Sequence, residues 1–198
     1  MSSIQLPIEQ RASSGAADLS ELLRRAVVEI RSPSGAGAGV IWRGGGLVVT
    51  NAHCVRRGAR LRLDVRGEMH AIEDVIQSRD HDLALLTVPS VTGPLLELRD
   101  ARTLRAGELV FAHGHPLGVS HSLAMGALHG IVRDQRTGDP RFIVADIRLA
   151  PGNSGGPLVD AQGRLLGLNS MVVGGLGVAI PAAIVHAFVA RATSIRAA

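Results

Sequence analysis

Most of the chain consists of short apolar runs separated by glycine, serine and proline, and one helical segment precedes them. The apolar positions of that segment recur at helical spacing, at Leu19, Leu22, Leu23 and Ala26. Asp18 and Glu21 stand where the residues of a capping box stand, so the pattern predicts a short helix that begins at Asp18. Residues 1–17 are polar and rich in serine and alanine, and we expect them to form a flexible tail.

From residue 26 onwards the apolar positions take the spacing of β-strands. Residues 61–66 alternate strictly between apolar and polar, which is typical of a half-buried strand. The other strands predicted for this first set are 26–31, 37–43, 47–50, 69–76 and 83–88. Residues 89–106 carry proline, glycine and charge and indicate a connection. A second set is predicted at 109–112, 123–132, 142–148, 158–160, 165–170 and 177–180.

Two sets of short strands predict an all-β fold of two small antiparallel β-barrels. Barrel 1 is expected at about 26–100 and barrel 2 at about 101–180, within one domain over 18–198. After Pro181 the apolar positions return to helical spacing, which predicts a closing helix at about 181–193.

Composition narrows the class of protein. The 46% of apolar residues is typical of a globular protein, and the net charge of +4 is spread along the chain. Aromatic residues make up only 2%, too few for a platform on which single-stranded nucleic acid stacks, so no nucleic acid partner is expected. No stretch is long enough to span a membrane, and residues 1–17 lack the apolar core of a secretory signal. We therefore expect a cytoplasmic protein as written, or a periplasmic or secreted one if a signal has been removed.

The segment Gly152-Asn153-Ser154-Gly155-Gly156-Pro157 is the most specific chemical signal. A serine hydroxyl becomes a nucleophile only beside a base, and glycines allow backbone N–H groups to converge on a developing oxyanion. The segment also matches the G-x-S-x-G pattern of α/β-hydrolases, but that fold requires a helix after the serine and the order serine, acid, histidine. Pro157 and a short strand follow here instead.

A histidine and an aspartate precede this serine. His53 follows the apolar strand 47–50, and Asp82 precedes the apolar strand 83–88. The order histidine, aspartate, serine is that of the chymotrypsin class, so we assign His53, Asp82 and Ser154 as the catalytic triad. Asp80 competes with Asp82, because two residues apart on an extended strand they would face the same side.

These segments resemble those of the HtrA-type (high-temperature-requirement) proteases. The resemblance rests on Thr50-Asn51-Ala52-His53, Asp82-Leu83-Ala84-Leu85 and residues 151–157, with further similarity at 114–118 and 177–181. It implies a chymotrypsin-like fold and a serine endopeptidase that acts on unfolded or damaged protein through an acyl-enzyme. It also implies an oxyanion hole made by the N–H groups of Gly152 and Ser154, and it supports Asp82 over Asp80, because the family's acid directly precedes Leu-Ala-Leu.

Two features depart from that family. The chain ends at residue 198, directly after the predicted closing helix, so no peptide-binding PDZ domain is expected. Residues 1–41 contain no aromatic residue of the kind through which family members form trimers, so we expect a monomer or a small homo-oligomer. The partners are expected to be polypeptide substrates. The alternative function is a catalytically silent binding or chaperone module on the same scaffold.

The substrate pocket has two candidate floor residues. Arg148 would select acidic side chains by bidentate pairing, whereas Leu149 would select small or medium apolar ones. Burying an unpaired guanidinium is costly, and Asp146, expected on the same strand face, would hold Arg148 away, so we choose Leu149. Ser170, Met171 and Val172 are expected to form the opposite wall.

No cofactor or metal is expected. The sole cysteine, Cys54, excludes an intramolecular disulfide and is interpreted as a small buried apolar residue. His113 and His115 form an H-x-H pair, but no third ligand is evident in the sequence, so a turn is the preferred interpretation.

Overall fold

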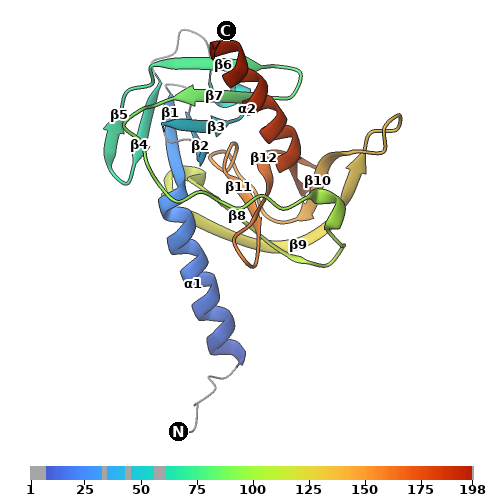
Figure 1. Ribbon diagram of the computed structural model, residues 1–198. Helices are drawn as coiled ribbons and strands as arrows, with labels where there is room; N and C mark the ends of the chain where they lie inside the picture. The colour runs from blue at the N-terminus through green and yellow to red at the C-terminus, as the bar shows by residue number, and fades with distance from the viewer. Residues whose placement is uncertain (1–7, 33–34, 43–45, 56–60, 198) are drawn as a thin grey trace, which may run out of the picture.

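The computed structural model describes residues 8–32, 35–42, 46–55 and 61–197. Strands dominate it, with one helix near each end of the chain (Figure 1). The helices are α1 (Ile8–Ala26) and α2 (Ala182–Ala197). Three single-turn 3-10 helices join strands, at Ala52–Cys54 (η1), Ala101–Thr103 (η2) and Pro116–Gly118 (η3).

The first set of strands forms a seven-stranded sheet in the order β5-β4-β1-β2-β3-β7-β6, with every pairing antiparallel. Its strands are β1 (Val27–Ser32), β2 (Gly35–Trp42), β3 (Leu47–Thr50), β4 (Arg62–Val65), β5 (Glu68–His70), β6 (Asp74–Ser78) and β7 (Leu83–Thr87). The single strand predicted at 69–76 is wrong, because residues 71–73 separate β5 from β6, which pair with opposite ends of the sheet. Residue 43, at the end of another predicted strand, lies outside the described residues.

The second set closes into a barrel in the order β10-β13-β12-β11-β8-β9. Its strands are β8 (Leu109–Gly114), β9 (Ser122–Arg133), β10 (Pro140–Asp146), β11 (Pro157–Asp160), β12 (Leu165–Val173) and β13 (Leu176–Pro181). The predicted all-β, chymotrypsin-like fold is therefore confirmed, with the first sheet in the form of a half-barrel and the second as a closed barrel.

The N-terminal helix begins ten residues earlier than the capping pattern indicated. It starts at Ile8, so residues 8–17 are helical and the predicted tail is wrong for them, while residues 1–7 lie outside the described part. Glu21 does not reach back to a cap; its carboxylate pairs with Arg24 one turn later, at 2.8 Å. Leu19, Leu23 and Ala26 bury the C-terminal half of α1 against the body, and the helix propagates from that anchor away from the sheets (Figure 1).

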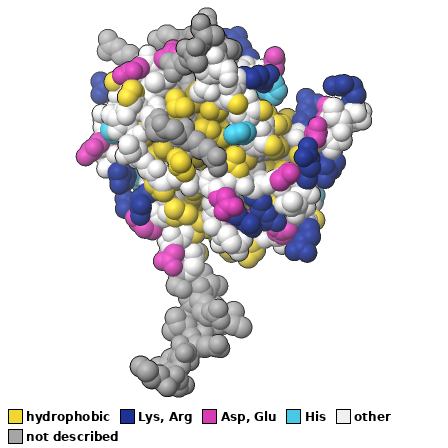
Figure 2. Space-filling view, viewed as in Figure 1, with side chains coloured by type: hydrophobic (Ala, Val, Ile, Leu, Met, Phe, Trp, Pro, Cys, Tyr) yellow, Lys and Arg dark blue, Asp and Glu magenta, His cyan; other side chains and the backbone are white. Residues whose placement is uncertain are grey.

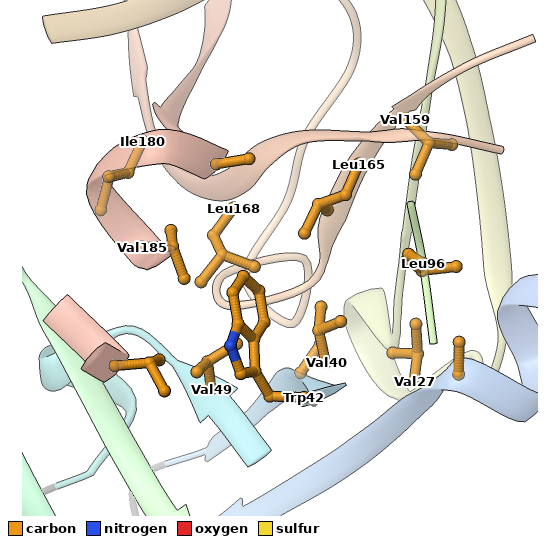
Figure 3. Packing of buried hydrophobic residues seen from close by; sticks show 14 of the residues in the cluster. Val27, Val40, Trp42, Val49, Leu96, Val159, Leu165, Leu168, Ile180 and Val185 are labelled. Atoms are coloured by element: carbon orange, nitrogen blue, oxygen red, sulfur yellow. The ribbon is translucent and has the colours of Figure 1, made fainter. Parts of the chain in front are cut away.

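The largest apolar cluster joins the two sheets and both helices. Trp42 of β2 lies at its centre and is only 4% exposed. Both sheets, α2 and the connection between the sheets contribute side chains to this cluster, and Figure 3 labels these members beside Trp42: Val27, Val40, Val49, Leu96, Val159, Leu165, Leu168, Ile180 and Val185. Separate clusters fill each sheet. The shared cluster holds the two halves in a fixed relation, so residues on either side of the junction can form one site.

The surface view agrees with the mixed charge of the sequence. On the face seen in Figure 2, hydrophobic side chains gather in the middle, while basic and acidic ones are interspersed around them. Of the helices that the structure describes, none has the length and hydropathy needed to cross a bilayer.

Candidate active site

Two of the three predicted triad residues, His53 and Ser154, line a cleft of about 490 Å³ between the two sheets. His53 and Cys54 border it from the first sheet, and Ser154 and Ser170 border it from the barrel. Asp82 does not border the cleft itself, but its carboxylate contacts the ring of His53. Residues 29 and 100 positions apart along the sequence thus meet in one place.

His53 and Asp82 form a close pair. The ring Nδ1 of His53 lies 2.8 Å from Oδ2 of Asp82, and the backbone N–H of His53 donates to Oδ1 at 3.0 Å. His53 is held in the 3-10 turn η1 directly after β3, and Asp82 lies in the turn before β7, whose strand pairs with β3. The pairing of β3 with β7 therefore brings the two side chains together.

Asp80 and Asp82 do not share a strand face as expected, because residues 79–82 form the turn between β6 and β7. In that turn Asp82 has a φ of 52°, in the left-handed region. Its carbonyl accepts the N–H of Ala52 at 3.0 Å and the side-chain amide of Asn51 at 3.1 Å. Asp80 is exposed, so the structure brings Asp82 alone to His53.

The pair shifts the pKa values of both groups. The hydrogen bond with Asp82, assisted by the neighbouring Cys54 thiol, raises the pKa of His53 well above its usual value despite burial. Burial acts to raise the pKa of Asp82, but its hydrogen bonds with His53 and with the hydroxyl of Ser170 outweigh that effect and lower it. Asp82 therefore carries its negative charge beside the ring across the neutral pH range.

Ser154 is placed by backbone contacts to the first sheet. Its carbonyl accepts the N–H of Ala38 at 2.8 Å and the thiol of Cys54 at 3.6 Å. Its hydroxyl donates to the carbonyl of Ser170 at 3.3 Å. Within the described part of the chain, no hydrogen bond joins that hydroxyl to the ring of His53. Catalytic hydrogen bonds are often long before substrate binds, so this arrangement is compatible with a resting site.

The loop before Ser154 forms a tight turn. The N–H of Asn153 donates to the carbonyl of Ala150 at 2.9 Å, with Pro151 and Gly152 between them and a φ of 108° at Gly152. Proline followed by a positive-φ glycine is the signature of a type II turn. The side chain of Asn153 accepts the N–H of Ala150 at 3.0 Å and strengthens the same turn.

This turn leaves two N–H groups available. The carbonyls of Pro151 and Gly152 accept N–H groups from Leu117 and His115, at 3.3 and 2.9 Å. Because N–H and C=O point in opposite directions across a trans peptide bond, the N–H of Gly152 points away from Leu117. Among the described residues, the N–H groups of Gly152 and Ser154 find no acceptor, and both residues border the cleft. The geometry suits a bound oxyanion.

The pocket candidates separate in space. Leu149 is half-buried and lines the cleft. Ser170, Met171 and Val172 line the same cleft. Arg148 is exposed and does not border the cleft, and it lies beyond the end of β10 rather than on its strand face with Asp146. The structure thus places Leu149, and not Arg148, in the cleft that His53 and Ser154 border.

Sequence reasoning missed a second role for Ser170. Besides bordering the cleft, its hydroxyl donates to Oδ2 of Asp82 at 2.9 Å, across 88 residues of sequence. Cys54 also differs from its interpretation as a buried residue, since it is half-buried and borders the cleft. No local pattern marks a serine in an apolar strand as a partner of a distant carboxylate.

The H-x-H pair does have a histidine neighbour. His121 lies with its ring 5.6 Å from that of His113 and 4.8 Å from that of His115, centroid to centroid. In the described part of the chain, however, no group of three or more histidine, cysteine, aspartate or glutamate side chains has an arrangement that could hold a metal ion.

The chain resembles known proteins over most of its length. The model of the trypsin-like peptidase domain matches residues 37–168. The mitochondrial serine protease HTRA2 of Drosophila pseudoobscura pseudoobscura is 36% identical over 171 residues, which are 81% of this chain and 40% of that protein. The chloroplastic Protease Do-like 1 of Arabidopsis thaliana is 33% identical over 163 residues, 75% of this chain and 37% of that protein.

A solved structure, the HtrA-type protease AlgW with a tripeptide, superposes with a TM-score of 0.74 at 30% identity, over 85% of this chain and 60% of that one. This chain spans about two-fifths of the length of the curated relatives named above. Because the domain model covers most of the chain and these relatives share its sequence and fold, the chain belongs to the trypsin-like serine proteases of the HtrA type.

Proposed function

We propose that this protein is a serine endopeptidase that hydrolyses unfolded or damaged polypeptides through an acyl-enzyme, with His53, Asp82 and Ser154 as its triad. The observation that carries the proposal is the contact of His53 with Asp82, at 2.8 Å, on a histidine that borders the same cleft as Ser154. A carboxylate on Nδ1 fixes the tautomer that leaves Nε2 free to accept a proton.

In the first step the Ser154 hydroxyl turns from the carbonyl of Ser170 towards His53. His53 takes its proton as Oγ bonds to the peptide carbon, and the carbonyl oxygen becomes an oxyanion. The N–H groups of Gly152 and Ser154 stabilise that oxyanion. His53 then protonates the leaving amine as the peptide bond breaks, and water, deprotonated by His53, releases the acyl group and restores Ser154.

The substrate class follows from the open cleft wall. Met171, Val172 and Val173 are all exposed, and in the described part these residues of β12 pair with β13 on one side only. An extended peptide can add to such an edge as a further strand. Unfolded chains present extended segments readily, which favours them over folded proteins. Leu149 borders the pocket and favours a small or medium apolar side chain before the cut.

The experiment is labelling with a fluorophosphonate probe, together with cleavage of casein. The wild type should be labelled at Ser154 and should degrade casein, and Ser154→Ala should do neither while its circular dichroism is unchanged. Ser120→Ala, at an exposed serine, is the matched control. A folded wild-type protein that neither reacts nor cleaves would instead support the silent binding or chaperone module.

Cytoplasmic location and a monomeric or small oligomeric state stay predictions from the sequence. Cell fractionation and light scattering on the native protein test them.

A further inference from the structure

Asn51 lies between the candidate base and the candidate acid. Its backbone carbonyl accepts the N–H of Cys54 at 3.2 Å and so closes the 3-10 turn that carries His53. Its side-chain Nδ2 donates to the backbone carbonyl of Asp82 at 3.1 Å. The residue is fully buried. One side chain and its own backbone thus contact the elements that hold both members of the pair.

The amide of Asn51 is not used for the turn that it begins. Asparagine is favoured before a helical turn because its side-chain oxygen accepts an N–H of the first turn. Asn51 makes no such bond, and its buried Oδ1 has no partner among the described residues. An unpaired buried oxygen costs stability. The contact with Asp82 is therefore the one hydrogen bond that this side chain makes in the described part.

Asp82 has a backbone conformation that requires support. Its φ of 52° lies in the left-handed region, which is disfavoured for residues other than glycine. In this conformation its carboxylate receives the His53 N–H, the His53 ring and the Ser170 hydroxyl, at 3.0, 2.8 and 2.9 Å. Because the side chain of aspartate is short, a change in its backbone dihedrals moves the carboxylate away from the ring.

We propose that Asn51 is a positioning residue for the reaction, whose amide holds the backbone of Asp82 where the carboxylate meets His53. The kinetic consequence rests on the proposed function. The carbonyl of Asp82 also accepts the N–H of Ala52, so loss of the amide leaves it with one hydrogen bond instead of two. Asp82 is then held less firmly, and His53 is less well oriented and less basic. The walls of the substrate cleft stay in place, so binding of the substrate is unaffected.

The test compares Asn51→Ala and Asn51→Ser with Gln77→Ala in the full chain. Gln77 is the matched control, because its Nε2 donates to the carbonyl of Val55 at 2.6 Å, a bond of the same kind beside the same turn but made to Val55 and not to Asp82. We expect kcat of the Asn51 variants to fall about 10- to 100-fold, since a displacement near 1 Å can cost that much, with KM unchanged. Gln77→Ala should keep the wild-type kcat.

A second readout does not depend on turnover. In a Ser154→Ala background, NMR titration of the His53 ring should show its pKa lowered towards the ordinary value in the Asn51 variants and unchanged with Gln77→Ala. A loss of packing alone would lower the melting temperature without that shift. An unchanged His53 pKa in folded Asn51→Ser or Asn51→Ala, or an equal shift with Gln77→Ala, would overturn the proposal. A wild type without peptidase activity would refute the proposed function, while the titration would still decide the role of Asn51.

Discussion

Acidification should destabilise this protein through His113 and His115. Both rings are buried, at 0% and 2% exposed, and among the described residues both nitrogens of His113 and Nε2 of His115 have no hydrogen-bond partner. Burial, together with the neighbouring histidines, lowers the pKa of His113 to about 3. Burial lowers that of His115 to about 4, although Glu29, 3.9 Å away, opposes the shift.

Proton linkage gives the direction and the size of the change in the free energy of unfolding with pH. Below pH 6.5 both histidines are protonated in the unfolded chain, whereas the folded protein keeps them neutral until about pH 4 for His115 and about pH 3 for His113. The unfolded state therefore binds more protons, and the free energy of unfolding falls as the pH falls through this window. At about 1.4 kcal/mol per pH unit per group, going from pH 6.5 to pH 5 costs about 2 kcal/mol for each histidine and about 4 kcal/mol for both.

His113→Leu isolates one of these contributions. Leucine suits the buried site, and the substitution removes no side-chain hydrogen bond, because neither ring nitrogen of His113 has a partner among the described residues. Urea unfolding at pH 7 and pH 5 should show a loss of stability smaller than that of the wild type by about 2 kcal/mol. His186→Gln, at an exposed position of α2, is the control and should keep the wild-type loss. If His113→Leu lost as much stability as the wild type, the linkage argument would be refuted.

Protonation of His113 and His115 should also affect the candidate active site. The backbone N–H of His115 donates to the carbonyl of Gly152 at 2.9 Å, so the segment that carries the buried histidines supports the turn before Ser154. Protonation of these rings is therefore expected to release the turn that presents the N–H groups of Gly152 and Ser154. Fluorophosphonate labelling should decline over the acid range in the wild type and less steeply in His113→Leu.

Three further predictions concern the triad, the pocket and the core. Asp82→Asn should lower kcat about 10⁴-fold because His53 would lose its tautomer, while Asp80→Asn should have little effect; steady-state kinetics on a peptide substrate would reveal the reverse order if the acid were misassigned. Matched peptides should be cleaved faster after Val than after Glu, because Leu149 and not Arg148 borders the cleft, and faster cleavage after Glu would contradict this. Trp42→Ala should lower the free energy of unfolding, measured in urea, by about 3–5 kcal/mol, since the indole is almost fully buried between the sheets. A decrease of less than about 1 kcal/mol would show that the junction does not depend on this side chain.

Much of the fold could be predicted because its signals are local. Alternating or continuous apolar runs, bounded by glycine and proline, mark strands whichever way they later pair, and most of the predicted strands are present within a few residues. Boundaries set by tertiary contacts were missed. The start of α1 is an example, since its anchor at Leu19, Leu23 and Ala26 packs on the body and supports a helix that extends back to Ile8.

The sequence by itself determined the chemistry available to this protein: His53, Asp82 and Ser154 stand in recognisable motifs, each beside a predicted strand. Tertiary structure alone decided how these groups are held. The bond from Ser170 to Asp82, the support of Asp82 by Asn51 and the exclusion of Arg148 from the cleft depend on the pairing of distant strands. The physical reason is that a side-chain hydrogen bond requires placement within a few tenths of an ångström, which the packing of the two sheets sets and local periodicity does not record.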